Sequence, residues 1–397
     1  MKLTLCTIAK NEAASLTKCL GSVRDVVDEM VVLDTGSTDR TPEIAREFGA
    51  RVYHFQWCND LSAARNEALK YVQGDWILVL NAEEELTPEI VPQIKQAILQ
   101  PNYLVVNLVR HEIGAEQVPY SLVSQLFRNH PAVRFSRPYH AIIDDSVVQL
   151  LQREPQWQVG YLPDVAILHH GYQLSAIASK NKFQIARSAM ENYLTKYPND
   201  AYACSKLGAL YVQMGEIDRG VQLLNRGIET NFIDPVLLYE LHYHLGIAYE
   251  YLQQLTLAKY HYQTASQLNI LPKLKLGAYN NLGNVLKDTS KLQQAKSTYE
   301  TVLQIDPNFA IGYYNLGMTL KALGQMPEAI AAYQKAISLN PEYAEAYQNL
   351  GVVLLKIGYV DESLLAFRRA IALHEQNNPS EAARLRQGLK EIGFPLS

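Results

Sequence analysis

The stretch Met30-Val31-Val32-Leu33-Asp34-Thr35-Gly36-Ser37 decides the fold of the first half of the chain, because a short apolar run ends there in an acidic, polar turn. An acid at the carboxyl end of a buried strand points into the crevice where open α/β sheets bind ligands. Other strand-like apolar runs surround this stretch at residues 3–8, 52–57 and 76–80. Later runs at 104–110, 122–127 and 165–168 would extend the same sheet.

Helical segments lie between these runs and complete the pattern. We expect helices over residues 14–23 and 61–72, one that starts at Thr41-Pro42 and ends near Gly49, and another that starts at Thr87-Pro88. Strand and helix alternate at this spacing in parallel sheets that have helices on both faces. The first half is therefore predicted to be an α/β domain.

Composition limits the classes of protein to consider. The chain has 397 residues, with 36 basic and 40 acidic side chains, and at about 100–200 residues per domain it should hold two or three domains. A nucleic-acid binder held by bulk electrostatics would show a basic excess, so we expect no nucleic-acid partner. The four cysteines are scattered along the sequence, so we expect them to be reduced thiols and not disulfides. No apolar run is long enough for a signal peptide or a membrane span, which predicts a cytoplasmic protein without a transmembrane segment.

The second half is repetitive. Gly283, Gly317 and Gly351 are spaced 34 residues apart. Each is preceded by a tyrosine four residues earlier and followed sixteen residues later by Tyr299, Tyr333 or Phe367. This pattern resembles the tetratricopeptide repeat, a helix pair of this period. We expect about five repeats and flanking helices over residues 176–397, an all-α superhelix whose aromatic residues fill the core. Its concave face could bind a protein partner, an acceptor or another copy of the chain.

Two common nucleotide-binding folds can be excluded from the first half. No G-x-G-x-x-G follows the first apolar run, and no G-x-x-x-x-G-K-[ST] occurs. The Rossmann and P-loop interpretations therefore fail.

Several ordered motifs instead resemble family 2 glycosyltransferases of the GT-A fold, in particular the bacterial lipopolysaccharide-core type. They are Thr7-Ile8-Ala9-Lys10-Asn11-Glu12, the segment 32–41 around Asp34, Asp60-Leu61-Ser62-Ala63-Ala64-Arg65-Asn66, the segment 74–80, and His169-His170-Gly171-Tyr172. The resemblance covers about residues 1–175, which we take as the transferase domain. It implies transfer of a sugar from a nucleotide-diphosphate donor, most simply UDP, to a glycan, lipid or protein acceptor, with inversion at the anomeric carbon.

The resemblance also implies a set of site residues. Glu83 and His169 would bind Mg²⁺ or Mn²⁺, a cation that neutralises charge on the leaving diphosphate. The nucleotide sugar would be held by a larger set: Thr7, Ala9, Asn11, Glu12, Asp34, Gly36, Ser37, Asp60, Arg65 and Asn81.

Two departures from the family pattern concern catalysis. The Asp-x-Asp position reads Asn81-Ala82-Glu83, and Ala141 stands where relatives carry a candidate base glutamate. Asp144 or Asp145, just downstream, could supply that base. The alternative is a catalytically weakened or inactive domain in a repeat scaffold. A nucleotidyltransferase is a weaker third hypothesis, because no Gly-rich phosphate loop follows the first strand.

Most of the single residues also have an ordinary structural interpretation. Asp39 could cap the turn before Thr41, and Asn11 and Glu12 could form a solvated loop. Residues 83–85 could be the acidic first turn of a helix, and His169 could be a core histidine beside His170. Arg65 could pair with a carboxylate. Arg128, Arg134 and Arg137 are expected to be solvated rather than to bind an anionic acceptor.

Overall fold

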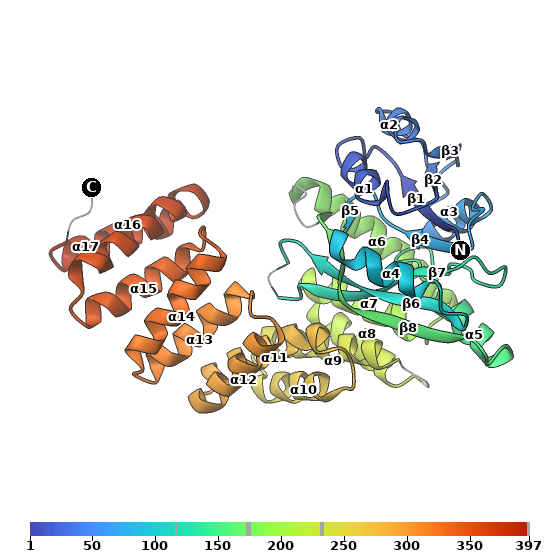
Figure 1. The fold of residues 1–397 in the computed structure, drawn as a ribbon. Coiled ribbons are helices and arrows are strands. Elements are labelled where there is room, and N and C mark those ends of the chain that lie inside the picture. Colours follow the sequence, from blue (N-terminus) through green and yellow to red (C-terminus); the bar gives the residue numbers. More distant parts are fainter. Residues whose placement is uncertain (116, 172–175, 231–233, 395–397) are drawn as a thin grey trace. The chain divides into compact units, whose positions relative to one another are not determined.

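The computed structural model describes residues 1–115, 117–171, 176–230 and 234–394, with residues 176–182 described by their backbone only. The chain divides into two compact units, Met1–Leu241 and His242–Ser397 (Figure 1). The predicted domain boundary at residue 175 and Tyr172 of the His-x-Gly-Tyr element lie outside the described residues. Within the described ranges, no helix is both long and apolar enough to cross a bilayer.

The first unit contains an eight-stranded sheet with the strand order β3-β2-β1-β4-β7-β6-β8-β5. The strands are β1 (Leu3–Ala9), β2 (Glu29–Asp34), β3 (Arg51–His54), β4 (Trp76–Val79), β5 (Glu84–Leu86), β6 (Tyr103–Glu112), β7 (Tyr120–Arg128) and β8 (Gln158–His169).

The sheet is mixed rather than wholly parallel. β1 pairs in parallel with β2 and with β4, and β6 pairs in parallel with β8, as predicted. β7 is antiparallel to both of its neighbours, β4 and β6, and β5 is antiparallel to β8. β6 and β7 are joined by a short connection, which suits a hairpin and not a helical crossover.

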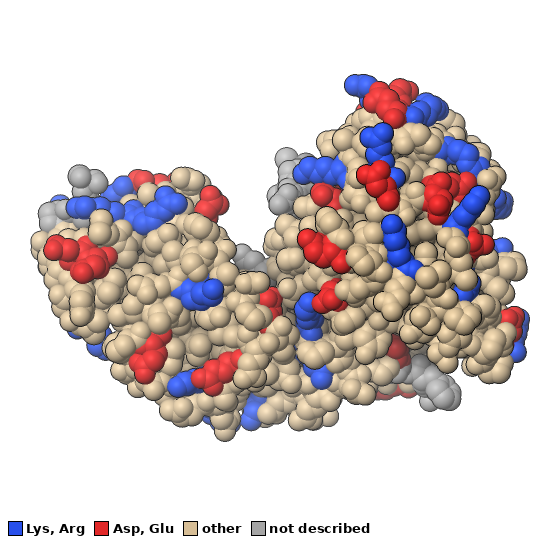
Figure 2. All heavy atoms as spheres, in the orientation of Figure 1, with Lys and Arg blue, Asp and Glu red and all other residues tan. Residues whose placement is uncertain are grey.

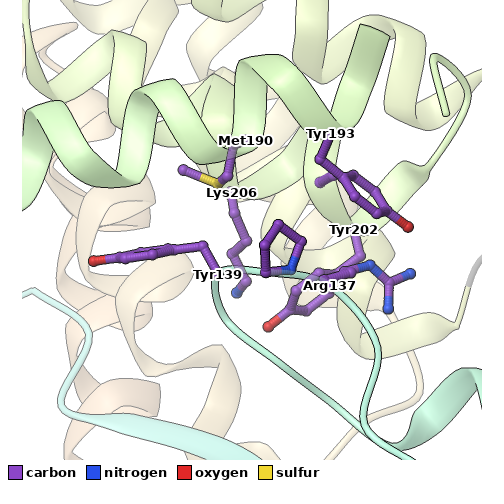
Figure 3. A pocket seen from close by; sticks show the side chains of 8 residues that line it. Arg137, Tyr139, Met190, Tyr193, Tyr202 and Lys206 are labelled. Carbon is purple, nitrogen blue, oxygen red and sulfur yellow. The ribbon is translucent and has the colours of Figure 1, made fainter. Parts of the chain in front are cut away.

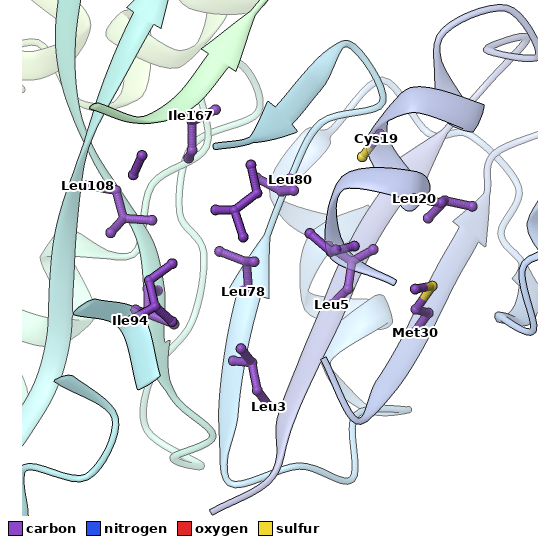
Figure 4. Close-up of a cluster of buried hydrophobic side chains, with 14 of the residues drawn as sticks. Leu3, Leu5, Cys19, Leu20, Met30, Leu78, Leu80, Ile94, Leu108 and Ile167 are labelled. Atoms are coloured by element: carbon purple, nitrogen blue, oxygen red, sulfur yellow. The ribbon is translucent and has the colours of Figure 1, made fainter. Parts of the chain in front are cut away.

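Helices cover both faces of the sheet, as the alternation predicted (Figure 1). One apolar cluster joins α1 (Leu16–Val23), α2 (Thr41–Glu47) and α4 (Val91–Ala97) to side chains such as Leu5 and Leu78 (Figure 4). The other cluster joins α3 (Leu61–Leu69) and α5 (Asp144–Arg153) to the alternate strand residues, including Ile77 and Val79. Because side chains alternate along a strand, both faces of each central strand are buried.

The first unit also includes helices of the segment 176–397, over which the sequence predicts repeats. They are α6 (Ala176–Lys196), α7 (Ala201–Gln213) and α8 (Ile217–Ile228), and α9 (Pro235–Tyr251) runs across the division between the units. A buried cluster joins α6 to α7, and the partly buried Tyr139 from the sheet domain packs against it.

The second unit is all-helical, as the repeat pattern predicted. It contains α10 (Leu255–Gln267), α11 (Leu276–Asp288), α12 (Leu292–Ile305), α13 (Ala310–Ala322), α14 (Met326–Leu339), α15 (Ala344–Lys356), α16 (Val360–Asn377) and α17 (Pro379–Glu391).

Glycines set the spacing of the helix pairs in this second unit. A Cβ atom at Gly283 would lie 2.6 Å from the Tyr299 ring, and one at Gly317 would lie 2.7 Å from the Tyr333 ring. The two tyrosines are fully buried. The aromatic residues of the motif therefore pack in the core, as expected, and only glycine permits this approach.

Charges of both signs are interspersed on the visible face of each unit (Figure 2).

Candidate active site

Polar side chains from distant parts of the sequence gather at one edge of the sheet, where its parallel strands end. Asp34 pairs with Ala9 at the end of β1 and with His54 at the end of β3. Glu112 at the end of β6 pairs with His169 at the end of β8. This carboxyl edge is where open α/β sheets bind ligands.

The Asp34 carboxylate is buried and organises the turn that follows it. It accepts hydrogen bonds from the backbone N–H of Ser37 at 3.1 Å and of Gly36 at 3.3 Å, and its Oδ2 lies 3.2 Å from His54 Nδ1. Burial opposes its charge, but the hydrogen bonds from Ser37, His54 and Gly36 lower the pKa of Asp34 below its ordinary value. Asp34 is therefore a fixed anion at the carboxyl end of β2.

The predicted loop 7–12 lies against this turn. Asn11, which has a left-handed φ of 57°, accepts a hydrogen bond from Thr38 N at 2.8 Å through its Oδ1. Asn11 N donates to Ser37 Oγ at 2.9 Å, and Glu12 N donates to Thr41 Oγ1 at 2.8 Å. The structure therefore brings two of the predicted motifs together in one polar loop pair.

Other members of the predicted nucleotide set lie deeper in the fold. Thr7 and Ala9 are buried in β1, and Thr7 Oγ1 has no hydrogen-bond partner among the described residues. Asp60 is the N-cap of α3, where its Oδ1 accepts from Ala63 N at 3.0 Å. The capping alternative is confirmed for Asp39, whose Oδ1 accepts from Thr41 N at 3.0 Å.

Asn81 is held on both sides by protein groups. Its Oδ1 accepts from Arg65 at 2.9 Å, and its Nδ2 donates to Glu84 Oε1 at 3.0 Å. Arg65 also lies over the Phe135 ring, 5.1 Å from its centroid, and its pKa is lowered chiefly by burial. The alternative that Arg65 pairs with a carboxylate is not what the structure shows, because the partner in contact is the Asn81 amide.

Residues 83–85 do not form the acidic first turn of a helix. Glu84–Leu86 is strand β5, and the Glu84 side chain is completely buried. Its carboxylate accepts from Arg110 at 2.9 Å, from Gln125 at 2.8 Å and from Asn81 N at 2.8 Å. Glu84 is therefore a structural anion, and a carboxylate with these partners is not available to a metal ion.

Glu83 and His169 are brought together, as the resemblance implied. Glu83 Oε2 lies 3.9 Å from His169 Nε2, and His169 Nδ1 lies 2.5 Å from Glu112 Oε2. Burial opposes the charged imidazole, but hydrogen bonds with Glu112 and Glu83 raise the pKa of His169 to about 9. Burial likewise opposes ionisation of Glu112, whose pKa is lowered to about 2 by His169 and Arg110.

The chemistry of Glu83 and His169 fits a divalent cation. A carboxylate and an imidazole face each other, and the second imidazole nitrogen is held by another carboxylate, which is the usual support of a metal-ligating histidine. Among the described residues, no group of three His, Cys, Asp or Glu side chains is arranged to hold a metal. The chain would supply two ligands of the cation. This number is common for Mg²⁺ sites in which phosphate oxygens and water complete the coordination.

The two candidate bases differ in their surroundings. Both carboxylate oxygens of Asp145 contact Arg137, at 2.7 and 3.1 Å. Asp144 is exposed and accepts one hydrogen bond, from Ser124 Oγ at 3.1 Å. Although water reaches it, the protein atoms around its carboxyl raise the pKa of Asp144 by desolvation.

The expectation of solvated arginines is wrong for two of the three. Arg137 is 9% exposed and pairs with carboxylates. Arg128 lies over the Trp76 and Trp157 rings and donates to the Tyr103 carbonyl at 2.6 Å. Neither has a free guanidinium to offer an anionic acceptor.

Sequence reasoning missed Arg110, Glu112 and Gln125, which complete the charged network at this edge. These residues lie within apolar strands, where only a polar residue in an otherwise buried run could have indicated them.

The geometry defines the class of the protein as an α/β domain with a polar carboxyl edge, followed by an all-helical region. The glycosyl transferase family 2 model matches residues 4–160, and tetratricopeptide repeat models match within residues 276–377. A TPR repeat-containing protein of Synechococcus elongatus is 43% identical over 291 residues, 73% of this chain and 72% of that protein. A Rickettsia felis protein described as an uncharacterized glycosyltransferase is 27% identical over 199 residues, 48% of this chain and 70% of that one.

Among solved structures, MamA 41-end from Desulfovibrio magneticus RS-1 has a TM-score of 0.40 at 22% identity, covering 45% of this chain and 97% of that one. The chain therefore carries a glycosyl transferase family 2 domain at residues 4–160, followed by tetratricopeptide repeats, and belongs with TPR repeat-containing proteins such as that of Synechococcus elongatus.

Proposed function

We propose that the protein transfers a sugar from a nucleoside-diphosphate donor, UDP-linked in the simplest case, to a hydroxyl of a glycan, lipid or protein. One observation carries the proposal: Asp34, with its turn Gly36–Ser37, and the Glu83–His169 pair stand at the same edge of the sheet. Such a donor needs two contacts: a fixed anion that accepts hydrogen bonds from the ribose or base, and a pair of residues that binds a cation beside the diphosphate.

Each residue has a role that follows from its surroundings. The Asp34 carboxylate, fixed by Ser37 and Gly36, accepts hydrogen bonds from the nucleoside. The Asn11–Glu12 loop, held against this turn by hydrogen bonds to Ser37 and Thr41, would form the neighbouring wall of the nucleoside site. Glu83 and His169 would hold Mg²⁺ or Mn²⁺, which when bound neutralises charge on the diphosphate. Thr7, Ala9, Asp60, Arg65 and Asn81 act by shaping and holding the pocket.

The transfer itself is proposed as a single displacement that inverts the anomeric carbon. Asp144 accepts the proton of the acceptor hydroxyl. At the same time the hydroxyl oxygen bonds to the anomeric carbon, and the bond from this carbon to the diphosphate oxygen breaks, so that the nucleoside diphosphate leaves. Asp144 suits this role better than Asp145 because Arg137 occupies both oxygens of Asp145. A raised pKa also brings a carboxylate closer to the ideal of a general base at neutral pH.

One observation favours a second candidate, a nucleotide-binding scaffold with little or no transfer. Asn81 stands at the first Asp-x-Asp position, and Arg65 and Glu84 engage its side chain. The site then has one carboxylate fewer for the cation. In both candidates the repeats would bind the acceptor, a partner protein or another copy of the chain, and the protein would be cytoplasmic.

Ligand binding and turnover separate these candidates. We expect UDP and UDP-sugars to raise the melting temperature in the presence of Mn²⁺, and UDP to be released slowly from a cleavable donor. Asp34→Asn, which keeps the side-chain size, should abolish both effects. Binding without release across donors and acceptors would favour the scaffold, and absence of binding would refute both nucleotide hypotheses.

A further inference from the structure

The loop that leads to the candidate bases has an unfavourable backbone. Ser136 and Ile142 close it with reciprocal hydrogen bonds, Ser136 N to Ile142 O at 2.9 Å and Ile142 N to Ser136 O at 3.3 Å. Between them, Arg137 has φ 75° and His140 has φ 51°. Left-handed conformations of residues other than glycine persist only where their surroundings fix them.

Arg137 supplies that fixation with its side chain. One guanidinium nitrogen lies 2.7 Å from Asp145 Oδ2 in α5, and another lies 2.8 Å from Asp200 Oδ2. The guanidinium also lies over the Tyr202 ring, 5.0 Å from its centroid. The Arg137 side chain is 8% exposed and that of Asp200 is 12% exposed, whereas Asp145 is 44% exposed, so the pair with Asp200 is the one shielded from solvent. Arginine is the one side chain whose planar fork can hold two carboxylates at once.

Asp200 belongs to the repeat region, not to the sheet domain. It is the N-cap of α7, where its Oδ1 accepts from Ala203 N at 2.8 Å, and it also accepts from Tyr193 OH of α6 at 3.1 Å. Figure 3 shows Arg137 beside Tyr202, and Tyr139 on the far side of the same pocket, near Met190. The space that remains there is about 10 Å³, room for about one water molecule.

We propose that Arg137 is a positioning residue: it clamps the loop before Asp144 and Asp145 to the first repeat helices, so that these helices complete the transferase site. The effect on turnover rests on the proposed function, but the clamp itself does not. Lys206 of α7 lines the same pocket as Arg137 and Tyr139.

The chain offers a matched control in Arg187. It pairs with two carboxylates, Glu191 at 3.0 Å and Glu216 at 2.6 Å, and lies over the Tyr211 ring, 5.3 Å from its centroid. All of these partners lie within the repeats. Arg137→Gln and Arg187→Gln therefore remove the same charge, but only the first releases the loop.

The experiment compares the two variants by hydrogen–deuterium exchange, UDP-dependent thermal stabilisation and kinetics in the full chain. We expect Arg137→Gln to speed exchange in residues 136–145, to leave stabilisation by UDP unchanged, and to lower kcat by about tenfold or more with the donor KM within about twofold. Arg187→Gln should change neither the loop nor kcat. Arg137→Lys, which can pair with one carboxylate at a time, should recover part of the lost kcat.

A second variant distinguishes the loss of the clamp from a folding defect. Asp200→Asn keeps an N-cap of α7 but loses the ion pair, so it should reproduce the faster loop exchange while UDP still raises the melting temperature, which shows that the domain remains folded. Exchange in residues 136–145 that stays at the wild-type rate in Arg137→Gln, or rises equally in Arg187→Gln, would overturn the proposal. If the wild type fails to turn over any donor, the proposed function fails, and loop exchange still decides the clamp.

Discussion

Glu83 Oε2 and His169 Nε2 face each other across 3.9 Å, although one residue precedes β5 and the other ends β8. The antiparallel pairing of these two strands produces this approach, since Glu84 and His169 are register partners.

This relationship predicts where Mn²⁺ should bind. Glu83→Gln and His169→Gln should each abolish the Mn²⁺-dependent part of the stabilisation by UDP, because each removes one of two protein ligands. Glu112→Gln, which removes the carboxylate that holds His169 Nδ1, should weaken Mn²⁺ by about 10–100-fold. Electron paramagnetic resonance of Mn²⁺ titrations measures this directly, and unchanged affinity in all three variants would refute the site.

The buried pair of Glu84 and Arg110 should contribute strongly to the stability of the first unit. Glu84→Ala leaves Arg110 and Gln125 without their common acceptor in the interior, and breaking such a pair costs about 3–5 kcal/mol of unfolding free energy. Urea denaturation measures the loss. The control is Glu47→Gln, whose partner Arg40 is exposed and lies 2.9 Å away, and which should change stability by no more than about 1 kcal/mol.

Two glycines of the second unit should respond to substitution by alanine with opposite changes in stability. Gly317→Ala should destabilise the second unit by about 1–3 kcal/mol, because its methyl group would overlap the fully buried Tyr333 ring. Gly388 lies in α17, and a Cβ there meets no atom within 4 Å. Gly388→Ala should therefore stabilise the unit by up to about 1 kcal/mol through helix propensity. Thermal or urea unfolding would show the two shifts in opposite directions, and equal shifts would contradict the packing.

A histidine pair makes the second unit sensitive to acid. His242 Nδ1 and His261 Nδ1 lie 2.9 Å apart, and both residues are buried. Burial lowers the pKa of His242, and burial together with His242 lowers that of His261 to about 4.

Both histidines are thus neutral in the folded state at a pH where the unfolded chain takes up protons. The contribution of each imidazole to stability is complete above about pH 6.5 and falls at lower pH, at up to about 1.4 kcal/mol per pH unit. For His261 this loss continues down to about pH 4. The His242→Gln/His261→Gln double variant should flatten the stability profile between pH 7 and 5. A profile as steep as that of the wild type would show that other groups carry the dependence.

The sequence was a good guide wherever a local pattern carried the information. Asp34 at the end of β2 and the spacing of Gly283 and Gly317 are local signals, and both elements lie where the pattern predicted them. The antiparallel direction of β7 was not readable, because an apolar run has the same composition in either direction.

The candidate site was less predictable because its partners are distant in sequence. Glu84 reads as one of three consecutive acids, and only its contacts with Arg110 and Gln125 distinguish it as buried. Arg137 likewise reads as a surface arginine, since nothing near it in sequence shows Asp200.

Asp200 begins a repeat helix and also neutralises an arginine of the sheet domain. The first repeat is consequently not interchangeable with the others: a deletion or replacement that removed Asp200 would disturb the transferase domain. Repeats could be gained or lost during evolution at the opposite end of the array, beyond α9, where no described contact of Arg137 would change. The repeat number should therefore vary among relatives mainly from the C-terminal side.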